Sequence, residues 1–223
     1  QLTREEQDGF SIESLRRAKA AIADGAFAAE IAPVTLSTRK GEVIVDTDEA
    51  PGKGNPDKIP TLKPAFAKDG TITAATSSSI SDGAAAVVLT RQSVAAAKGA
   101  TPVARIVAHA AHAQKPSEFT IAPIGAINKC LERAGWSIDD VDLFEVNEAF
   151  ACVAMFAMRD LGIPHDKINV NGGATALGHP IGASGTRIIT TLIAALQRGG
   201  KRKGVASLCI GGGEATAIAV ELI

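Results

Sequence analysis

The segment LCIGGGE, residues 208–214, combines a reactive side chain with an unusually bare backbone. Cys209 can serve as an acid or a base, because a thiolate forms where its surroundings stabilise the charge. Apolar runs on both sides of the segment predict a hairpin between two buried strands. Such a turn needs one or two residues with positive φ, which Gly supplies without steric cost. A third glycine exceeds that need, so we expect something to approach the backbone there.

His179 is the second candidate for chemistry, in the glycine-rich segment NGGATALGHPIGASG of residues 171–185. The segment lacks the Gly-Lys-Ser/Thr ending of a P-loop and does not match the dinucleotide fingerprint. A helix start near Ser184 could still hold a phosphate group. A lone loop histidine usually only caps a turn, because imidazole titrates near neutrality in any role. Asn147 and Cys209, which we expect at strand ends of the same sheet, favour a catalytic role for His179.

The order of elements after Pro102 indicates how these residues could meet. Apolar periodicity predicts strands over 103–110, 141–146, 168–173, 204–210 and 215–223. Helices are predicted over 124–135, 148–162 and 182–200. The order β-α-β-α-β-α-β-β is typical of an α/β sheet with helices packed on its faces. Functional residues gather at strand ends in such sheets, where loops lead into helices.

Residues 1–102 have a less regular pattern. An amphipathic helix is predicted over 4–24, opened by a capping box of Thr3 and Glu6. Two short strands follow within 30–47, and the proline- and glycine-rich run 48–64 indicates a surface excursion. The small residues of 70–90 predict a loop, a short helix and a strand.

Composition excludes several classes of protein. The chain has 223 residues, 46% of them hydrophobic, which is enough for one large domain or two modest ones. A net charge of −1 provides no global field for nucleic acid or an anionic membrane, and no apolar run approaches the length of a membrane span. The three cysteines form no disulfide framework and no metal-ligand spacing, which indicates a reducing compartment, and we expect a cytoplasmic protein. His109 and His112 lack further ligands, so we expect no metal and no cofactor.

Three segments in this order resemble the C-terminal signatures of the thiolase family: NEAFA at 147–151, NVNGGATALGHPIGASGTRI at 169–188 and LCIGGG at 208–213. The likeness runs over the whole chain, because 2–8 and 27–34 resemble the entry to the family's loop domain and 62–74 resembles its exit. The NEAF form is similar to acetoacetyl-CoA and 3-ketoacyl-CoA thiolases. Sterol-carrier-type thiolases, which carry a His in place of this Asn, fit less well.

The resemblance implies a role for each of four catalytic residues. His179 would activate the acyl-accepting cysteine and contribute to a first oxyanion hole, and Asn147 would hold a water that completes this hole. Cys209 would remove the α-proton of an acetyl thioester or protonate the leaving thiolate. Gly211 would offer its N–H to a second oxyanion hole. These roles agree with the chemistry of a thiol near pKa 8.5 and of backbone N–H groups that no side chain blocks.

The resemblance also implies contacts with coenzyme A, which would be a substrate. Ser78 takes the place of the family's pantetheine-contacting serine, and Lys53 and Lys58 match basic positions that touch CoA phosphates in some members. Ordinary exposed charge explains both lysines equally well, because phosphate contacts by Lys are replaceable. Pro51 stands where some bacterial members place an arginine, and ATSSS stands where many carry an Asn-Ala-Ser run. The same channel would be lined by Phe66, Ala74, Ala149 and Phe150.

By this resemblance the chain supplies only part of a thiolase. The family's nucleophilic cysteine lies in an N-terminal half for which this sequence has no counterpart. Cys130 is expected to be a buried structural thiol, and Cys152 is expected to lie in the core or directly behind the site residues, so neither is a candidate nucleophile. The expected architecture is the layered α-β-α-β-α arrangement of thiolases. This chain would contribute the rest of the CoA-binding loop domain (1–74), the end of the N-terminal domain (75–102) and the C-terminal domain (103–223). The expected partners are an N-terminal piece, with which the chain would complete a homodimer or homotetramer, and acyl-CoA and CoA.

Two other interpretations stay open at this point. One is another condensing enzyme of the same fold, such as a ketoacyl-ACP synthase. Such relatives use a second histidine where this chain has Asn147 and lack a cysteine at the last turn. The other is a non-catalytic acyl-CoA-binding subunit. The presence of Asn147, His179 and Cys209 together argues against that subunit, although the chain alone is expected to be inactive.

Overall fold

The computed structural model describes all residues, 1–223, and its centre is a four-stranded mixed sheet with the strand order β3-β6-β5-β4. The short edge strand β4 runs parallel to β5, whereas β5–β6 and β6–β3 are antiparallel pairs. β5 and β6 form the hairpin predicted around the three glycines. The strands are β3 (Ala104–Ala113), β4 (Leu143–Val146), β5 (Lys203–Ile210) and β6 (Glu214–Leu222).

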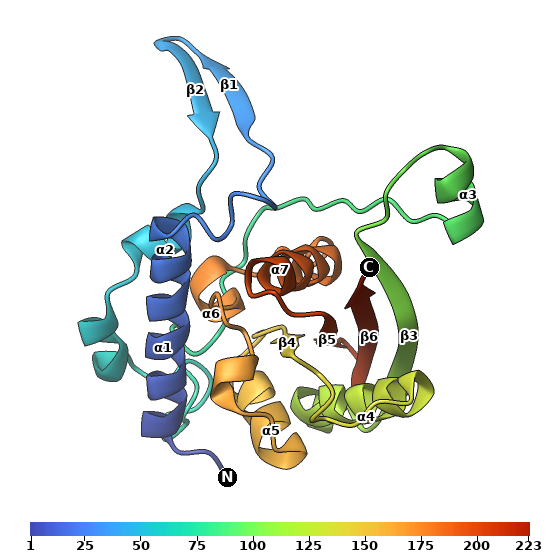
Figure 1. The fold of residues 1–223 in the computed structure, drawn as a ribbon. Coiled ribbons are helices and arrows are strands. Elements are labelled where there is room, and N and C mark those ends of the chain that lie inside the picture. The colour runs from blue at the N-terminus through green and yellow to red at the C-terminus, as the bar shows by residue number, and fades with distance from the viewer.

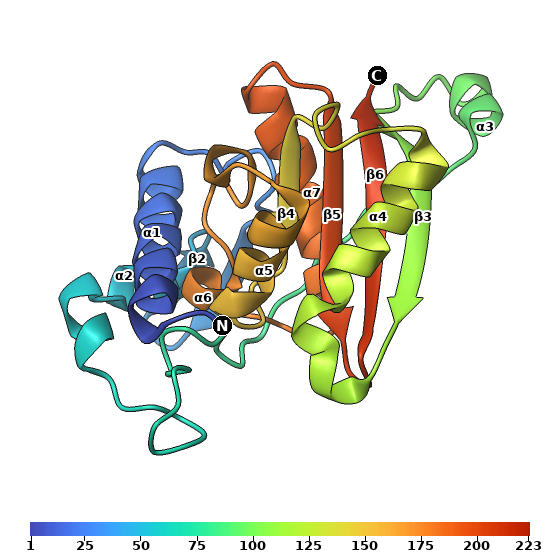
Figure 2. The same ribbon diagram turned by 90° about the horizontal axis from the view of Figure 1, so that it is seen from below.

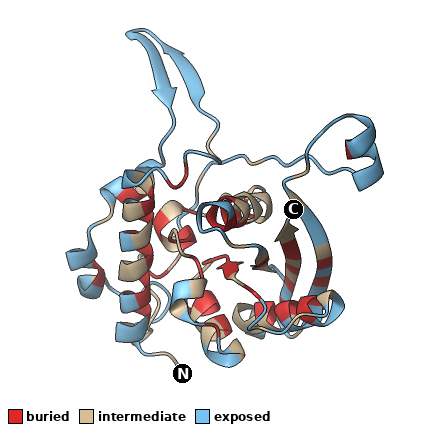
Figure 3. Cartoon of the chain, viewed as in Figure 1, coloured by how far each residue is buried: buried red, intermediate tan, exposed pale blue.

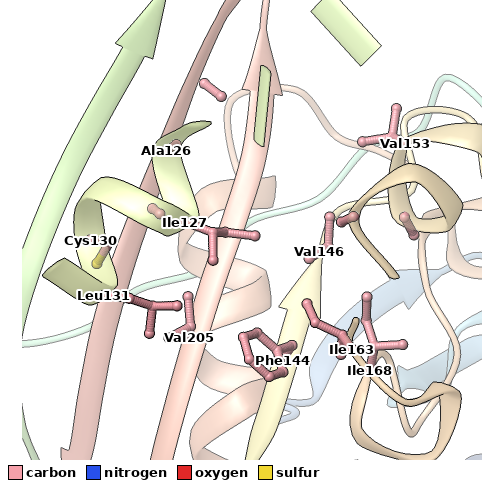
Figure 4. Close-up of a cluster of buried hydrophobic side chains, with 14 of the residues drawn as sticks. Ala126, Ile127, Cys130, Leu131, Phe144, Val146, Val153, Ile163, Ile168 and Val205 are labelled. Carbon is pink, nitrogen blue, oxygen red and sulfur yellow. The ribbon is translucent and has the colours of Figure 1, made fainter. Parts of the chain in front are cut away.

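Helices cover both faces of this sheet, as the alternation of elements predicts (Figures 1 and 2). α4 (Ala122–Ala134) and α5 (Ala151–Leu161) lie on one face, and α7 (Ser184–Arg198) lies on the other. Side chains of each strand alternate between the two layers. Val205 therefore joins the larger core cluster, which Figure 4 shows beside α4, and Ala206 joins the cluster under α7.

The first hundred residues lie beside this domain. α1 (Arg4–Ala23) begins with the predicted capping box, in which Thr3 Oγ1 accepts from the Glu6 N–H and the Glu6 carboxylate accepts from the Thr3 N–H. β1 (Val34–Thr38) and β2 (Gly41–Val45) form a hairpin that projects away from the sheet, and all of its residues are exposed (Figures 1 and 3). The shorter helices are α2 (Glu49–Lys53), α3 (Gln92–Ala97), α6 (Ala174–Leu177) and the 3₁₀ segments η1 (Pro56–Thr61), η2 (Pro116–Ile121) and η3 (His165–Lys167).

The strand predicted over 168–173 is wrong, because only Ile168 forms a bridge, to Phe144 of β4. The side chain of Asn169 replaces the rest of the strand. Its Oδ1 accepts from the Val146 N–H at 2.9 Å and its Nδ2 donates to the Val146 carbonyl at 2.8 Å. Because the side-chain amide satisfies the edge of β4 as a peptide group would, the main chain is free to turn away at Asn169, whose φ is +47°.

Two further boundaries differ from the prediction. The helix predicted from residue 148 begins at Ala151, because Phe150 is extended and pairs with Ser77, and Glu148 is drawn into the interior. The short helix and strand predicted within 70–90 are absent. Residues 84–90 are extended, and no backbone hydrogen bond joins them to the rest of the chain. Val88 and Leu89 are 94% and 71% exposed, so this apolar run lacks the neighbours that a strand requires.

No helix of the chain is both long and apolar enough to cross a bilayer. The boundaries proposed at residues 74 and 102 stay predictions.

Candidate active site

Asn147 and Cys209 lie at the carboxyl ends of the parallel strands β4 and β5. Val146 is opposite Ser207, and the Asn147 N–H donates to the Ser207 carbonyl at 2.9 Å. Cys209 is two residues beyond Ser207 on the same strand. Parallel strands place their carboxyl ends at one edge of a sheet, so both side chains belong to that edge, as the sequence predicts.

The Asn147 amide is buried and has no partner. Its residue is 1% exposed, yet neither Oδ1 nor Nδ2 makes a hydrogen bond within the chain. An unsatisfied buried amide costs about 1–3 kcal/mol. Such groups are retained where they serve a ligand or an ordered water. The free amide therefore marks a place where a polar group from outside the chain is expected to bind.

His179 lies in the loop between α6 and α7. The backbone N–H of His179 donates to the Ser79 carbonyl at 3.0 Å, and this bond fixes the loop against residues 79–83. The approach is close, because a Cβ on Gly178 would lie 2.1 Å from Ser81 Oγ and one on Gly83 would lie 2.7 Å from Pro180 Cγ. These glycines permit the contact between two segments that are about a hundred residues apart in the sequence.

Ser184, the first residue of α7, determines which nitrogen of His179 is free. Its Oγ is 2.5 Å from His179 Nδ1 and 3.0 Å from the Pro180 carbonyl, to which it donates. A hydroxyl has only one hydrogen, so this network assigns the hydrogen on the imidazole to Nδ1. Nε2 then keeps its lone pair and can accept a proton. Burial, together with the charge of Arg187, holds the pKa of His179 below its ordinary value, which favours the neutral base.

The thiol of Cys209 is half-buried beside that of Cys152. Burial raises the pKa of Cys209 above the ordinary thiol value. The pKa of Cys152 is raised to about 11, by burial first and by the proximity of Cys209 as a smaller effect. Cys209 is therefore a thiol at neutral pH that can donate a proton and, once deprotonated, is a strong base. Cys130 is fully buried against the Ala108 carbonyl, as predicted.

The three glycines of the hairpin turn play different parts. Gly212 and Gly213 have φ of +85° and +86°, whereas Gly211 is not in that region. A Cβ on Gly213 would lie 2.5 Å from the Gln114 carbonyl oxygen. The group that approaches the backbone at Gly213 is therefore another part of the same chain, the backbone at Gln114, and not a ligand. A Cβ on Gly211 would meet nothing within 4 Å, and Gly211 is exposed. Of the three residues, only Gly211 is free of structural demands and open to a ligand.

Most residues predicted to contact CoA lie together. Ser78 donates from both N–H and Oγ to the Ala149 carbonyl, at 3.0 Å each. The ring of Phe150 lies edge-on to that of Phe66 and to that of Phe119, with 6.1 Å between centroids in both pairs. Phe66 is 74% exposed, which leaves an apolar surface for a ligand. The segment of Ser78 continues into Ser79, the residue that binds the His179 loop.

The remaining predicted contacts are not joined to this group. Ala74 is exposed. Lys53 pairs with Glu49 at 2.8 Å, both side chains being exposed, and the side chain of Lys58 makes no hydrogen bond. No group of three or more His, Cys, Asp or Glu side chains is placed to hold a metal ion.

Three neighbours of the site were not predicted in the roles they have: Ser184, which was considered only as a helix start that could hold a phosphate group, Arg187 and Glu148. Ser184 is five residues after His179, a spacing that one turn of loop and the start of a helix happen to close. Arg187 follows one helical turn later and acts on His179 by charge. Glu148 stands inside the NEAF segment, and its position there was the only available signal. None of the three has a spacing that a single sequence would mark.

The fold and the candidate site together define a class of protein: a layered α/β domain with a buried amide and a thiol at neighbouring strand ends and a neutral imidazole in the loop that enters α7. Comparison with known families agrees with this class. Residues 100–222 match the description "Thiolase, C-terminal domain" and residues 1–93 match "Thiolase, N-terminal domain". The chain belongs to the thiolase family.

Named relatives support the same family. The chain is 47% identical to an acetyl-CoA acetyltransferase of Syntrophomonas wolfei, over 100% of this chain and 57% of the relative. It superposes on the Bacillus anthracis acetyl-CoA acetyltransferase with a TM-score of 0.95 and 43% identity, covering 100% of this chain and 57% of the other. For the Acat5 thiolase of Ascaris suum in complex with coenzyme A the TM-score is 0.92 at 42% identity, with coverage of 100% and 56%. The chain thus spans a little over half the length of these relatives.

Proposed function

We propose that this chain carries the acid–base half of a thiolase active site. The reaction is acyl transfer between a 3-ketoacyl-CoA or acetyl-CoA and a cysteine nucleophile, in the degradative or the synthetic direction. The observation that carries the proposal is the unpartnered amide of Asn147, buried at the strand edge that also bears Cys209. Burying an amide without a hydrogen-bond partner is unfavourable, and a water or substrate oxygen that binds to Asn147 would explain why it is buried in this way.

Each of these residues then has a defined part in the reaction. His179 Nε2 takes the proton of the nucleophilic cysteine, and its new N–H, with a water held by Asn147, binds the enolate oxygen of the acetyl thioester. In thiolysis the nucleophilic thiolate attacks the 3-keto carbonyl, the carbon–carbon bond breaks, and Cys209 donates its proton to the departing enolate carbon. The products are an acyl-cysteine and acetyl-CoA. In condensation Cys209 takes that proton back. Gly211 would donate its N–H to the oxyanion formed at the acyl carbonyl.

We also propose that the nucleophile comes from the N-terminal part of the same thiolase. Residues 84–90 support this proposal, because an extended apolar run with unpaired N–H and C=O groups is a ready site for strand addition. The substrate is a CoA thioester, whose pantetheine would pass Ser78, Phe66 and Phe150. A cytoplasmic location and a homodimeric or homotetrameric complete enzyme are part of the proposal.

The test separates the two catalytic roles. In the complete enzyme, Cys209→Ser should still accept a labelled acetyl group but stall before carbon–carbon bond formation, since a hydroxyl is a far weaker base than a thiol. His179→Ala should instead slow acylation by about a hundredfold or more. Cys130→Ser, a buried thiol in the core, is the matched control and should leave both steps unchanged. Normal acylation in His179→Ala together with no acylation in Cys209→Ser would overturn the assignment.

A further inference from the structure

The carboxylate of Glu148 is fully buried and forms no ion pair. Four neutral donors surround it. Oε1 accepts from Asn169 Nδ2 at 2.9 Å, and Oε2 accepts from Ser14 Oγ at 2.8 Å, Thr175 Oγ1 at 2.7 Å and the Thr175 N–H at 3.2 Å. The side chain therefore joins α1, the turn after β4 and the segment that enters α6.

Two of these donors cannot reverse their roles. Asn169 cannot flip its amide, because Oδ1 accepts from the Val146 N–H and Nδ2 donates to the Val146 carbonyl. The Thr175 N–H is a backbone group and can only donate. Each oxygen of Glu148 thus faces one obligatory donor. The surroundings of Glu148 suit a carboxylate, which only accepts hydrogen bonds. A glutamine at this position would not fit them, because its NH₂ group would face a donor in either orientation of the amide.

The segment beside Glu148 is held tightly. A Cβ on Gly173 would lie 2.3 Å from the Glu148 carboxyl carbon, and one on Gly172 would lie 2.5 Å from the Ser14 carbonyl oxygen. The Gly173 N–H donates to Ser14 Oγ at 2.9 Å. This packing accounts for the two glycines of the NGG sequence, to which the proposed reaction gives no role.

α6 transmits this constraint to His179. Ala176 and Leu177 donate to the Gly173 carbonyl, and Gly178 donates to the Ala174 carbonyl at 2.8 Å. His179 is the next residue. On the other side, Glu148 directly follows Asn147. One carboxylate thus braces both the turn that carries the free amide and the short helix that leads to the imidazole.

We infer that Glu148 is a positioning residue, which fixes the His179 loop relative to Asn147. This inference deepens the proposed function and rests on it for its catalytic meaning. It predicts that loss of the carboxylate loosens residues 173–179 selectively and leaves the sheet intact.

The experiment is hydrogen exchange on the chain itself, for Glu148→Gln. The amides of residues 176–179 should exchange at least tenfold faster than in the unaltered chain, and those of β5 and β6 should change less than twofold. The pKa of His179, followed by NMR, should rise toward its ordinary value as its burial is lost. In the completed enzyme kcat should fall at least tenfold with KM within twofold. The exchange and titration results do not depend on the enzyme being a thiolase, so the two proposals can fail separately.

Glu145→Gln is the matched control. Glu145 is a second buried glutamate, on β4 three residues before Glu148. Burial raises its pKa to about 8 although the Arg187 guanidinium lies 3.8 Å from its Oε2, and no hydrogen bond holds this carboxylate, so an amide of the same shape can replace it. Its exchange pattern should match that of the unaltered chain. If Glu148→Gln does not fold, Thr175→Val removes one donor from Glu148 and no other hydrogen bond, and it should give the same pattern at about threefold. Unchanged exchange at 176–179, or an equal rise in β5 and β6, would overturn the inference.

Discussion

Alanine substitution of the three glycines after Cys209 should give three different results, because their surroundings differ. Gly211 has no positive φ and no neighbour within 4 Å of an added Cβ, so its free energy of unfolding should change by less than about 1 kcal/mol. Gly212 also has open space, but its φ of +85° should cost about 1–2 kcal/mol in an L-residue.

Gly213 combines the strained φ with a collision. Its added Cβ would lie 2.5 Å from the Gln114 carbonyl oxygen and 2.8 Å from that of Lys115, and neither backbone oxygen can rotate away. The Gln114 N–H donates back to the Gly213 carbonyl at 3.0 Å, so a shift of the loop would break this bond. Overpacking of this kind costs about 1–3 kcal/mol. Together with the strain, Gly213→Ala should lose about 2–5 kcal/mol.

Urea unfolding measures the series, with the single tryptophan Trp136 as the reporter. Its ring packs against the larger core cluster and under the Lys203 ammonium, 5.0 Å from the ring centroid. The urea concentration at the unfolding midpoint should be highest for Gly211→Ala, lower for Gly212→Ala and lowest for Gly213→Ala. Equal losses at Gly211 and Gly213 would refute the assignment of Gly213 to packing. The same result would remove the reason for regarding Gly211 as free for a ligand.

Two other changes test the charges and tautomers of the site. Glu145 keeps its proton in the folded state up to about pH 8 and loses it near 4.5 when unfolded, so the folded state binds more protons in between. The free energy of unfolding should therefore fall with rising pH by up to about 1.4 kcal/mol per unit, and Glu145→Gln should flatten this slope between pH 6.5 and 8, measured by urea titration. Ser184→Ala removes the acceptor of His179 Nδ1–H and should slow acetylation of the completed enzyme about tenfold. Thr190→Ala, on the same helix, should not slow it.

Much of the fold could be predicted because local signals agreed with tertiary packing. The capping box of α1, the periodicity of α4 and α7 and the glycine hairpin each have their cause within a few residues. The predicted strand at 168–173 failed for a different reason. Its β-rich sequence was overridden by Asn169, whose side chain takes the place of a strand edge, and a single sequence gives no sign of this substitution.

The site was predictable where a residue type is rare and chemically active. Asn147 and His179 stand at loop positions and Cys209 stands near the end of β5, where such side chains are conspicuous. The residues that support them were not predictable, because serine, threonine and glutamate are common. Ser184 matters only because its one hydrogen is given to the Pro180 carbonyl, and Glu148 only because four donors converge on it. These contacts depend on the three-dimensional arrangement of the chain, which the spacing of residues along the sequence does not reveal.

The structure also separates what this chain organises alone from what it leaves open. The loop of His179 is fixed by Ser79, by Ser184 and, through α6, by Glu148 and α1, all within the chain. Exposed apolar residues lie next to this loop, at Ile181 with 81% and Ile80 with 100% exposure, and along 84–90. Transition-state stabilisation depends on groups that are already oriented. In the proposed mechanism the imidazole of His179 is therefore already oriented by contacts within this chain, and the nucleophile is the group that the mechanism still requires.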